Sequence, residues 1–351
     1  MYSPRLVFWR LAYHSLRCLF TYQTMSNAAP ELLQPLLKLY IQLGSGVLLG
    51  WVLGRFLPKT VPVLIGHFLF WVGVPISIIT FLHHADLSGA IWIAPVMAWV
   101  AILLGAGLAW SWIKLQTFRH SADASNKPSQ ASLKSWSKPT QGSFLLSAMV
   151  GNTGYLGFPI TLTLIGEKYF GWALFYDMLG TTIGAYGLGV LLAARFGSET
   201  ASYRQLVQAL LQNPALWSLG FGLGFRQIPL PELVQRSLQG FAWSAIALSL
   251  VLIGMRLSQL DSWSNLRQAS VSLGIKMLLV PLVLGISLFQ LGITGPPQLV
   301  IVLQMAMPPA FATLVIAEVY DLDRELTVTA LAVGSTGLLL TLPIWLLLFS
   351  P

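Results

Sequence analysis

Long apolar runs recur along almost the whole chain, and they constrain its fold more than any other feature. About 20 apolar residues cross a bilayer as a helix, and apolar runs of this kind follow one another from Pro35 to Pro351. Only 9% of the 351 residues are charged, whereas about a quarter are charged in soluble domains. The mean hydropathy of +0.71 agrees with this composition. We therefore expect an all-α integral membrane protein.

The apolar runs predict ten transmembrane helices. We place them at residues 36–57, 62–82, 89–113, 142–166, 171–195, 206–226, 234–257, 268–290, 298–319 and 327–349. The long connection 117–141 is polar, rich in Ser and contains Pro, which predicts a flexible cytoplasmic loop. Residues 1–34 contain three Arg and are too polar to span. They form either an amphipathic surface helix or an extension before a start at Met25, and we prefer the second interpretation.

The distribution of Lys and Arg predicts the orientation. Three basic residues, Lys168, Arg226 and Arg236, fall in loops on one side of the predicted helices. The opposite side holds Arg55, Lys59, Lys114, Arg119, Lys127, Lys134, Lys138, Arg195, Arg204, Arg256, Arg267 and Arg324. Because basic loops stay in the cytoplasm, both termini are expected on the non-cytoplasmic side of the cell membrane. Loop Lys and Arg also explain the net charge of +8, so no nucleic acid partner is expected.

Two halves of the chain carry matching features, which predicts an inverted repeat of five helices each, over 35–195 and 196–351. The run GVLLGWVLGRFLP in the first predicted helix is echoed by SLGFGLGFRQIP in the sixth. The fourth helix is expected to break at Pro159 and the ninth at Pro308 and Pro309. Two broken helices from inverted halves can cross at the middle of the membrane.

A proline inside a helix costs about 3 kcal/mol, and lipid cannot satisfy the carbonyl groups that it frees. Breaks of this kind are therefore expected where protein or water lines a cavity. The second half-helices would present unpaired amides and positive dipole ends, which favour an anion. For Pro159 taken alone, an ordinary proline kink is the alternative.

Three stretches carry a family resemblance: GNTGYLGFPITLTLIG, NPALWSLGFGLGF, and AMPPAFATLVIAEVYDLD followed by a helix that ends in TLPIWLLL. They resemble the auxin efflux carrier family over nearly all of residues 35–350. The resemblance implies a ten-helix transporter of small organic anions with an elevator-like motion. By matching motif, it implies a substrate site at Asn152, Gly157, Pro159, Pro308 and Pro309.

The sequence departs from the family pattern in the ninth predicted helix. Members often carry Asn three residues beyond the second proline, where this chain has Ala312. Gln304 or Thr313 could supply the missing polar contact.

Four polar residues are expected inside the predicted helices, and a fifth, Asp323, just before the tenth. Asn152 contacts either the substrate or uncapped backbone, whereas the neighbouring Thr153 is expected to pack. Asp177 is costly in lipid, so it serves either in proton coupling, which requires burial, or as a structural partner of a neighbouring helix. Lys276 either reaches the cytoplasmic interface or pairs with Asp177 or with the substrate. Asp323 is well placed to cap the tenth helix.

No cofactor or metal site is expected. The chain has one cysteine, and the neighbouring His83, His84 and Asp86 lie in a short loop where two adjacent imidazoles rarely converge on one ion. No Walker motif is present, so a proton gradient or the membrane potential would supply the energy.

The leading hypothesis is a secondary transporter of a small organic anion in the lipid bilayer, and not an enzyme. A coupling proton or cation and a homodimer are compatible with the sequence. An intramembrane enzyme that acts on a lipid-soluble substrate is the alternative, although no catalytic motif supports it. A sensor on a transporter fold would leave the same features.

Overall fold

The computed structural model describes residues 37, 40–41, 43–126, 136–197, 203–259 and 265–350. Within these ranges the regular elements are helices, and the only β-structure is one isolated bridge. The described helices that are long and apolar enough to cross a membrane are six: Thr60–His84, Ile93–Phe118, Glu167–Phe196, Glu232–Ser258, Leu266–Gln290 and Arg324–Phe349. The predicted N-terminal segment 1–34 and the centre of the predicted loop 117–141 lie outside the described residues.

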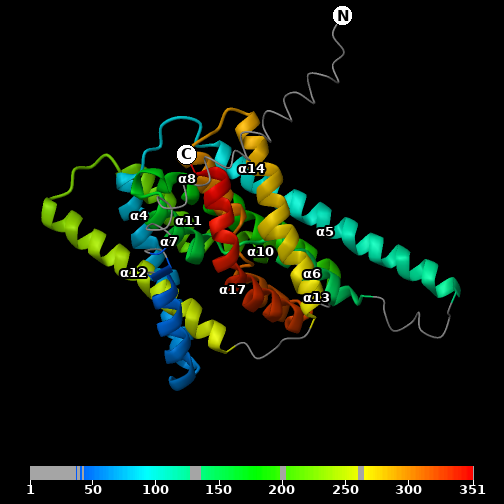
Figure 1. Cartoon of the computed structure of the whole chain (residues 1–351). Helices are drawn as coiled ribbons and strands as arrows, with labels where there is room; N and C mark the ends of the chain where they lie inside the picture. Colours follow the sequence, from blue (N-terminus) through cyan, green and yellow to red (C-terminus); the bar gives the residue numbers. More distant parts are fainter. Residues whose placement is uncertain are drawn as a thin grey trace, which may run out of the picture.

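The helices follow one another in a simple order (Figure 1). They are Leu43–Phe56, α3 (Thr60–Phe68), α4 (Val74–His84), α5 (Ile93–Asn126), α6 (Lys138–Met149), α7 (Phe158–Leu164), α8 (Phe170–Phe175), α9 (Val190–Phe196), α10 (Tyr203–Leu211), α11 (Pro214–Phe225), α12 (Glu232–Ser258), α13 (Leu266–Leu273), α14 (Val280–Gln290), α15 (Pro296–Met305), α16 (Phe311–Val319) and α17 (Arg324–Phe349). Wider π-helical turns interrupt them at η1 (Leu69–Gly73), η3 (Thr153–Gly157), η5 (Tyr176–Thr182), η6 (Ala185–Gly189) and η7 (Gly274–Leu279), and η4 (Glu167–Tyr169) is a short 3-10 helix.

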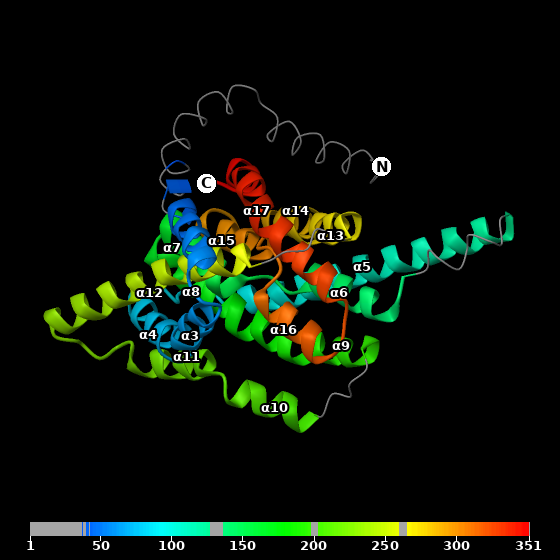
Figure 2. The ribbon, with the colours of Figure 1, turned by 90° about the horizontal axis from the view of Figure 1, so that it is seen from below.

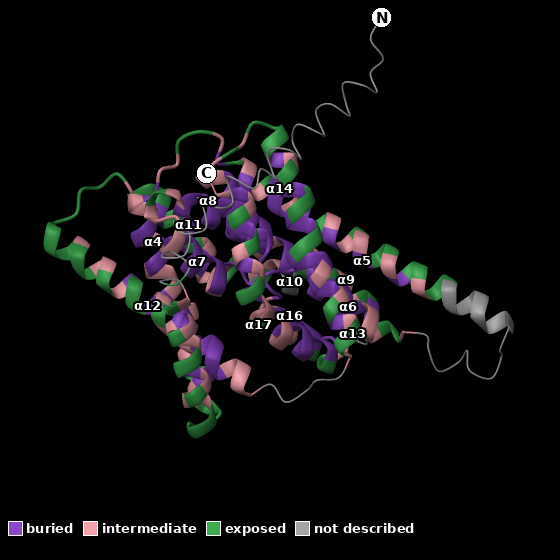
Figure 3. Ribbon diagram, in the orientation of Figure 1, coloured by how far each residue is buried: buried purple, intermediate pink, exposed green. Residues whose placement is uncertain are grey.

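The helices form two layers that we name by their contents. The α12 layer consists of α3, α4, α11, α12 and the helix Leu43–Phe56, which pack on one another. The crossover layer consists of α5 to α9 and α13 to α17. In Figure 1, α4 and α12 lie on the left and α5, α6 and α13 on the right, and Figure 2 shows the same separation from below. Buried residues concentrate in the crossover layer and are fewer along α12 (Figure 3).

Prolines inside the membrane helices coincide with π-helical turns. Pro75, Pro159 and Pro281 each occupy the second residue of a helix, and a π-helical turn comes directly before each of these helices. A proline ring clashes with the preceding turn and donates no hydrogen bond, so a wider turn at this point accommodates it. In α17, Pro343 leaves the carbonyl of Leu339 free, and the Tyr40 hydroxyl donates to it over 2.6 Å.

Two predicted boundaries differ from the structure. The predicted sixth helix, 206–226, is wrong as a continuous element, because it divides into α10 and α11 at Asn213. Pro214 disfavours a helical residue before it, and the Asn213 side chain accepts a hydrogen bond from Ala215 N–H over 3.0 Å to cap α11. In addition, α5 continues to Asn126 and so occupies the first part of the predicted loop.

The helix ends meet at two opposite ends of the molecule. At one end, Asp86 N–H donates to the Lys168 carbonyl over 2.9 Å. At the other, Asp323 caps α17 by accepting from Leu326 N–H over 2.9 Å, as predicted, and also accepts from the Thr140 hydroxyl over 2.8 Å. These contacts hold α6 against the start of α17.

Candidate functional site

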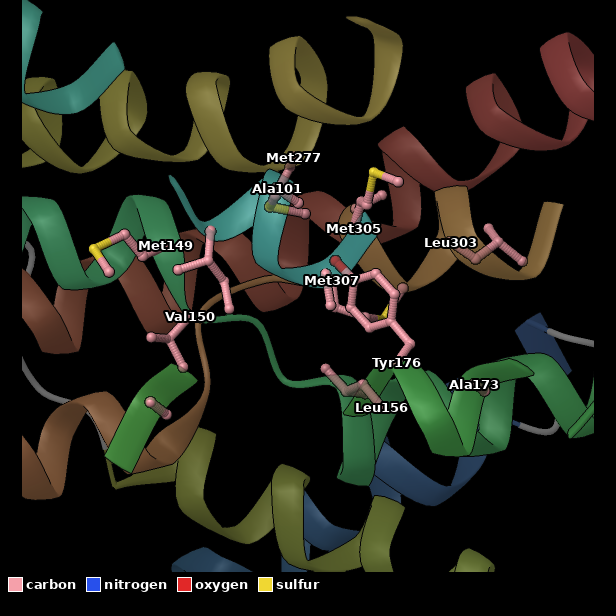
Figure 4. Packing of buried hydrophobic residues seen from close by; sticks show 14 of the residues in the cluster. Ala101, Met149, Val150, Leu156, Ala173, Tyr176, Met277, Leu303, Met305 and Met307 are labelled. Carbon is pink, nitrogen blue, oxygen red and sulfur yellow. The ribbon is translucent and has the colours of Figure 1, made fainter. Parts of the chain in front are cut away.

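Two short extended segments, one after α6 and one after α15, cross inside the crossover layer. We call this pair of segments the crossover. An antiparallel bridge pairs Gly151 with Pro309, and Asn152 N–H donates to the Pro308 carbonyl over 2.7 Å. Apolar side chains surround the two segments, including those of Met305, Met307 and Tyr176 in Figure 4. The two interruptions are therefore joined to each other through backbone hydrogen bonds.

The first interruption is not where the sequence predicts it. The helix ends at Met149 and resumes at Thr153, so the prediction of a break at Pro159 is wrong. Pro159 lies inside the second half-helix, and the carbonyl that it cannot satisfy, that of Tyr155, is 3.4 Å from the Ser249 hydroxyl of α12, which lies closer, at 2.7 Å, to the Ile246 carbonyl. The freed carbonyl thus faces a polar group of a neighbouring helix and not lipid.

The second interruption agrees with the prediction. Pro308 and Pro309 lie in the extended segment between α15 and α16. Because a proline has no N–H to donate, a pair of them ends the helical hydrogen bonding at this point.

Asn152 is buried at the crossover, with 4% of its surface exposed. Its backbone is held by Pro308, but its side-chain nitrogen Nδ2 has no hydrogen-bond partner, and the side chain does not cap η3. A buried polar group without a partner is unusual in a native protein. The structure therefore does not support the capping interpretation and leaves an amide donor free.

Asp177 belongs to η5, and its carboxylate lies against the start of η3, the half-helix that follows the first interruption. Its carboxylate accepts a hydrogen bond from the Thr153 hydroxyl, and a Cβ atom added to Gly154 would lie 3.2 Å from its Oδ2. Asp177 is buried as predicted, with 6% exposed. Thr153 is more than a packing residue, because it binds this carboxylate. A negative charge here lies at the positive end of the half-helix.

The side chain of Lys276 lies at the C-terminal end of a helix, where the partial charge is negative. Its ammonium group donates to the carbonyl of Met305, the last residue of α15, over 2.8 Å. A Cβ atom on Gly151 would be 3.2 Å from its Nζ. The interpretation that Lys276 reaches the cytoplasmic interface is wrong, because only 3% of the residue is exposed. No ion pair joins it to Asp177 among the described residues.

Gln304 connects the two half-helices across the crossover layer. Its Nε2 donates to the Thr161 hydroxyl of α7 over 3.3 Å, whereas its Oε1 has no partner. The Oε1 atom lies against Gly157, which has no side chain to exclude it. Thr313, the other candidate for a polar contact, donates instead to the Ala310 carbonyl at the start of α16 over 2.7 Å. Of the two residues, Gln304 is the one with an unsatisfied polar atom.

Sequence reasoning missed Gly151, Ser249 and the role of Thr153. Gly151 forms the bridge to Pro309, and Ser249 lies on α12, in the other layer. The one local signal was the Thr next to Asn152, a residue type that is common at helix starts.

His83 and His84 lie away from the crossover. They line an apolar cavity of about 340 Å³ between α4, α11 and α12, and the two rings are 5.5 Å apart. Asp86 is engaged by Ser88, whose hydrogen bonds hold the pKa of that carboxyl below its usual value. Within the described ranges, no three His, Cys, Asp or Glu residues are grouped so that they could hold a metal ion.

Comparison with known proteins supports a transport function. A family model described as "Membrane transport protein" matches residues 132–346. An uncharacterized transporter of Methanothermobacter thermautotrophicus is 28% identical over 277 residues, which cover 78% of this chain and 84% of the relative. An uncharacterized transporter of Methanocaldococcus jannaschii is 26% identical over 212 residues, which cover 58% of this chain and 67% of that protein.

Proposed function

We propose that this chain, which belongs to the auxin efflux carrier family of membrane transport proteins, is a secondary active transporter of a small organic anion. The observation that carries the proposal is the crossover, where Asn152 is hydrogen-bonded to Pro308 and its own amide is free. A free buried donor between two half-helix ends suits a carboxylate.

The start of α16 is the better candidate position for the substrate charge. At the start of η3 the carboxylate of Asp177 already lies beside Gly154. At the start of α16, by contrast, Ala310 provides no side-chain cap, so the amides of Phe311 and Ala312, which precede the Thr313 amide bonded to the Ala310 carbonyl, are available to a ligand. In the proposal, the residues around this position are Asn152, Gly157, Gln304, Pro308 and Pro309. Pro159 follows Gly157 in the same half-helix.

Asp177 is the proposed coupling residue. A proton on its carboxyl removes the negative charge beside η3 and thereby favours entry of an anion. Lys276 keeps its positive charge at the end of α15, where it compensates the carbonyl groups of that helix. Proton binding and anion binding are then coupled through the crossover, without any bond being made or broken.

The proposed architecture has ten membrane helices in two inverted repeats, 35–195 and 196–351, in the cell membrane with both termini outside. Alternating access would move the crossover layer against the α12 layer. The contact of 3.4 Å between Ser249 and the Tyr155 carbonyl lies between these layers at the crossover, whereas Gln239 and Trp243 of α12 donate to Glu167 of η4 over 3.0 and 3.2 Å. A homodimer is compatible with this arrangement.

Transport by purified protein in liposomes tests the proposal. We expect uptake of at least one of radiolabelled malate, indole-3-acetate or glutamate above protein-free liposomes, driven by an imposed pH gradient or potential. Asn152→Ala should reduce the uptake at least tenfold, whereas Gln290→Ala, at an exposed amide at the end of α14, should not. Uptake of none of the three acids would contradict the assignment of an organic anion.

A further inference from the structure

We infer that Arg256 of α12 binds the carboxylate group of the substrate from the side opposite to the crossover. The inference rests on the proposed function, since it assigns a residue of the α12 layer to the same anion.

The Arg256 side chain lies against the start of α16. Its guanidinium carbon is 5.1 Å from the ring centroid of Phe311, the first residue of that half-helix. A Cβ atom on Gly66 of α3 would lie 2.8 Å from Nη2 of Arg256, so the absence of a side chain on Gly66 leaves room for the guanidinium. The charged group is therefore placed between α3 and the open end of α16.

Arg256 shares a face of α12 with a residue that contacts the crossover. Ser249, two turns earlier, contacts the Tyr155 carbonyl, and residues seven apart lie on the same helix face. The guanidinium thus belongs to the surface that α12 turns toward the crossover layer.

No carboxylate neutralises Arg256 in the part of the chain that the structure describes. The two ion pairs there, Arg236 with Glu232 and Arg324 with Glu318, involve other residues and exposed side chains. Arg256 is half-buried in the last turn of α12, and a charge that is withdrawn from water is costly unless it is paired. An anionic ligand would provide the missing partner.

The chemistry of arginine fits this ligand. Its planar fork holds a carboxylate through two parallel hydrogen bonds, which a lysine ammonium cannot do. The second residue of α16 is Ala312 and the Thr313 hydroxyl is engaged by Ala310. This half-helix therefore has no free polar side chain in its first turn, and Arg256 would supply the charged contact.

A purely structural role is the alternative. A guanidinium over an aromatic ring is attracted to it, so Arg256 would then only stabilise the contact between α12 and α16. In that case its replacement would lower the melting temperature and leave the KM for transport unchanged.

Transport kinetics distinguish the two roles. Wild type, Arg256→Gln, Arg256→Lys and the exposed control Arg267→Gln are reconstituted in phosphatidylcholine liposomes, and the KM for malate, indole-3-acetate and glutamate is measured. For the acid that wild type transports, we expect the KM to rise at least tenfold in Arg256→Gln and to rise clearly in Arg256→Lys. Arg267→Gln should keep the wild-type KM. Because Arg256→Lys retains the charge, it provides a result if Arg256→Gln does not fold.

The possible outcomes separate the inference from the proposed function. If wild type transports one of the acids and the variants keep its KM, the inference is overturned and the proposed function stands. If wild type transports none of the acids, both fail. If the variants differ from wild type only when phosphatidylglycerol is added, Arg256 binds a lipid headgroup phosphate, and the inference is again overturned.

Discussion

The backbone N–H of Asn152 donates to the carbonyl of Pro308, so the two interrupted helices hold each other at their interruptions. This bond fixes the backbone of Asn152 without using its side chain, whose Nδ2 has no partner. The backbone amide therefore fixes the position of Asn152, and the side-chain amide remains available to a ligand.

Replacing Asn152 by Ala should affect binding far more than stability. The variant keeps the backbone bond to Pro308 and loses a side-chain amide whose nitrogen makes no hydrogen bond. We expect the free energy of unfolding to change by less than about 1 kcal/mol, because no bond from Nδ2 is lost. Substrate affinity should fall at least tenfold. Thermal unfolding in detergent and binding of the radiolabelled acid measure the two effects, and the reverse pattern would restore the capping interpretation.

Replacing Gly157 by Ala should separate the two half-helices. The added methyl group would collide with the buried Gln304 side chain, and overpacking of this kind costs about 1–3 kcal/mol. Gln304→Ala in the same chain should recover part of that loss, which a double-mutant cycle measures. Gly187→Ala is the matched control, because nothing lies within 4 Å of its added atom. Additive effects of the two substitutions would contradict the contact.

The sequence predicts the apolar helices, the break at Pro308 and Pro309, and the cap at Asp323, because each depends on local chemistry. The position of the first break depends on tertiary structure. Gly151 is extended because it pairs with Pro309, which lies far away in the sequence. Pro159 lies within a helix, and the Tyr155 carbonyl that it frees faces a serine hydroxyl of another layer.

The position of Lys276 could not be predicted for a similar reason. In the sequence, Lys276 is close enough to the end of its apolar run for its side chain to reach the membrane surface. In the structure the carbonyl of Met305 offers a nearer partner, which exists only because α15 ends at the crossover. A sequence pattern indicates how far a side chain can reach, but not which partners the fold brings within that distance.

Replacing Asp177 by Asn should uncouple transport from protons. The substitution imitates the protonated carboxyl beside Thr153, so the charge at this position no longer changes with pH. We expect uptake driven by a pH gradient to be lost, whereas exchange of labelled for unlabelled acid persists and becomes independent of pH. Asp86→Asn is the control, because Ser88 lowers the pKa of Asp86 and keeps it ionised near neutral pH. If uptake driven by a pH gradient persists in Asp177→Asn, Asp177 is not the coupling residue.

Replacing Asp323 by Ala should destabilise the end of the crossover layer where α6 and α17 meet. The variant loses the cap on Leu326 N–H and the hydrogen bond from Thr140. Loss of a cap costs about 0.5–2 kcal/mol, and the lost hydrogen bond from Thr140 adds to this. Glu318→Ala removes an exposed ion pair with Arg324 and should cost no more than about 1 kcal/mol. Equal melting temperatures for the two variants would contradict the difference.

Replacing Gly254 by Leu should detach the helix Leu43–Phe56 from α12. A side chain on Gly254 would collide with the backbone of Val47 and Trp51, and close approach at small residues is a main source of helix association in lipid. Gly240 of the same helix is exposed and has nothing within 4 Å of an added Cβ, so Gly240→Leu tests the loss of glycine without the collision. We expect Gly254→Leu to lower the melting temperature and the yield of folded protein, while Gly240→Leu resembles wild type. If both variants behave alike, the contact between these two helices does not contribute to the stability of the α12 layer.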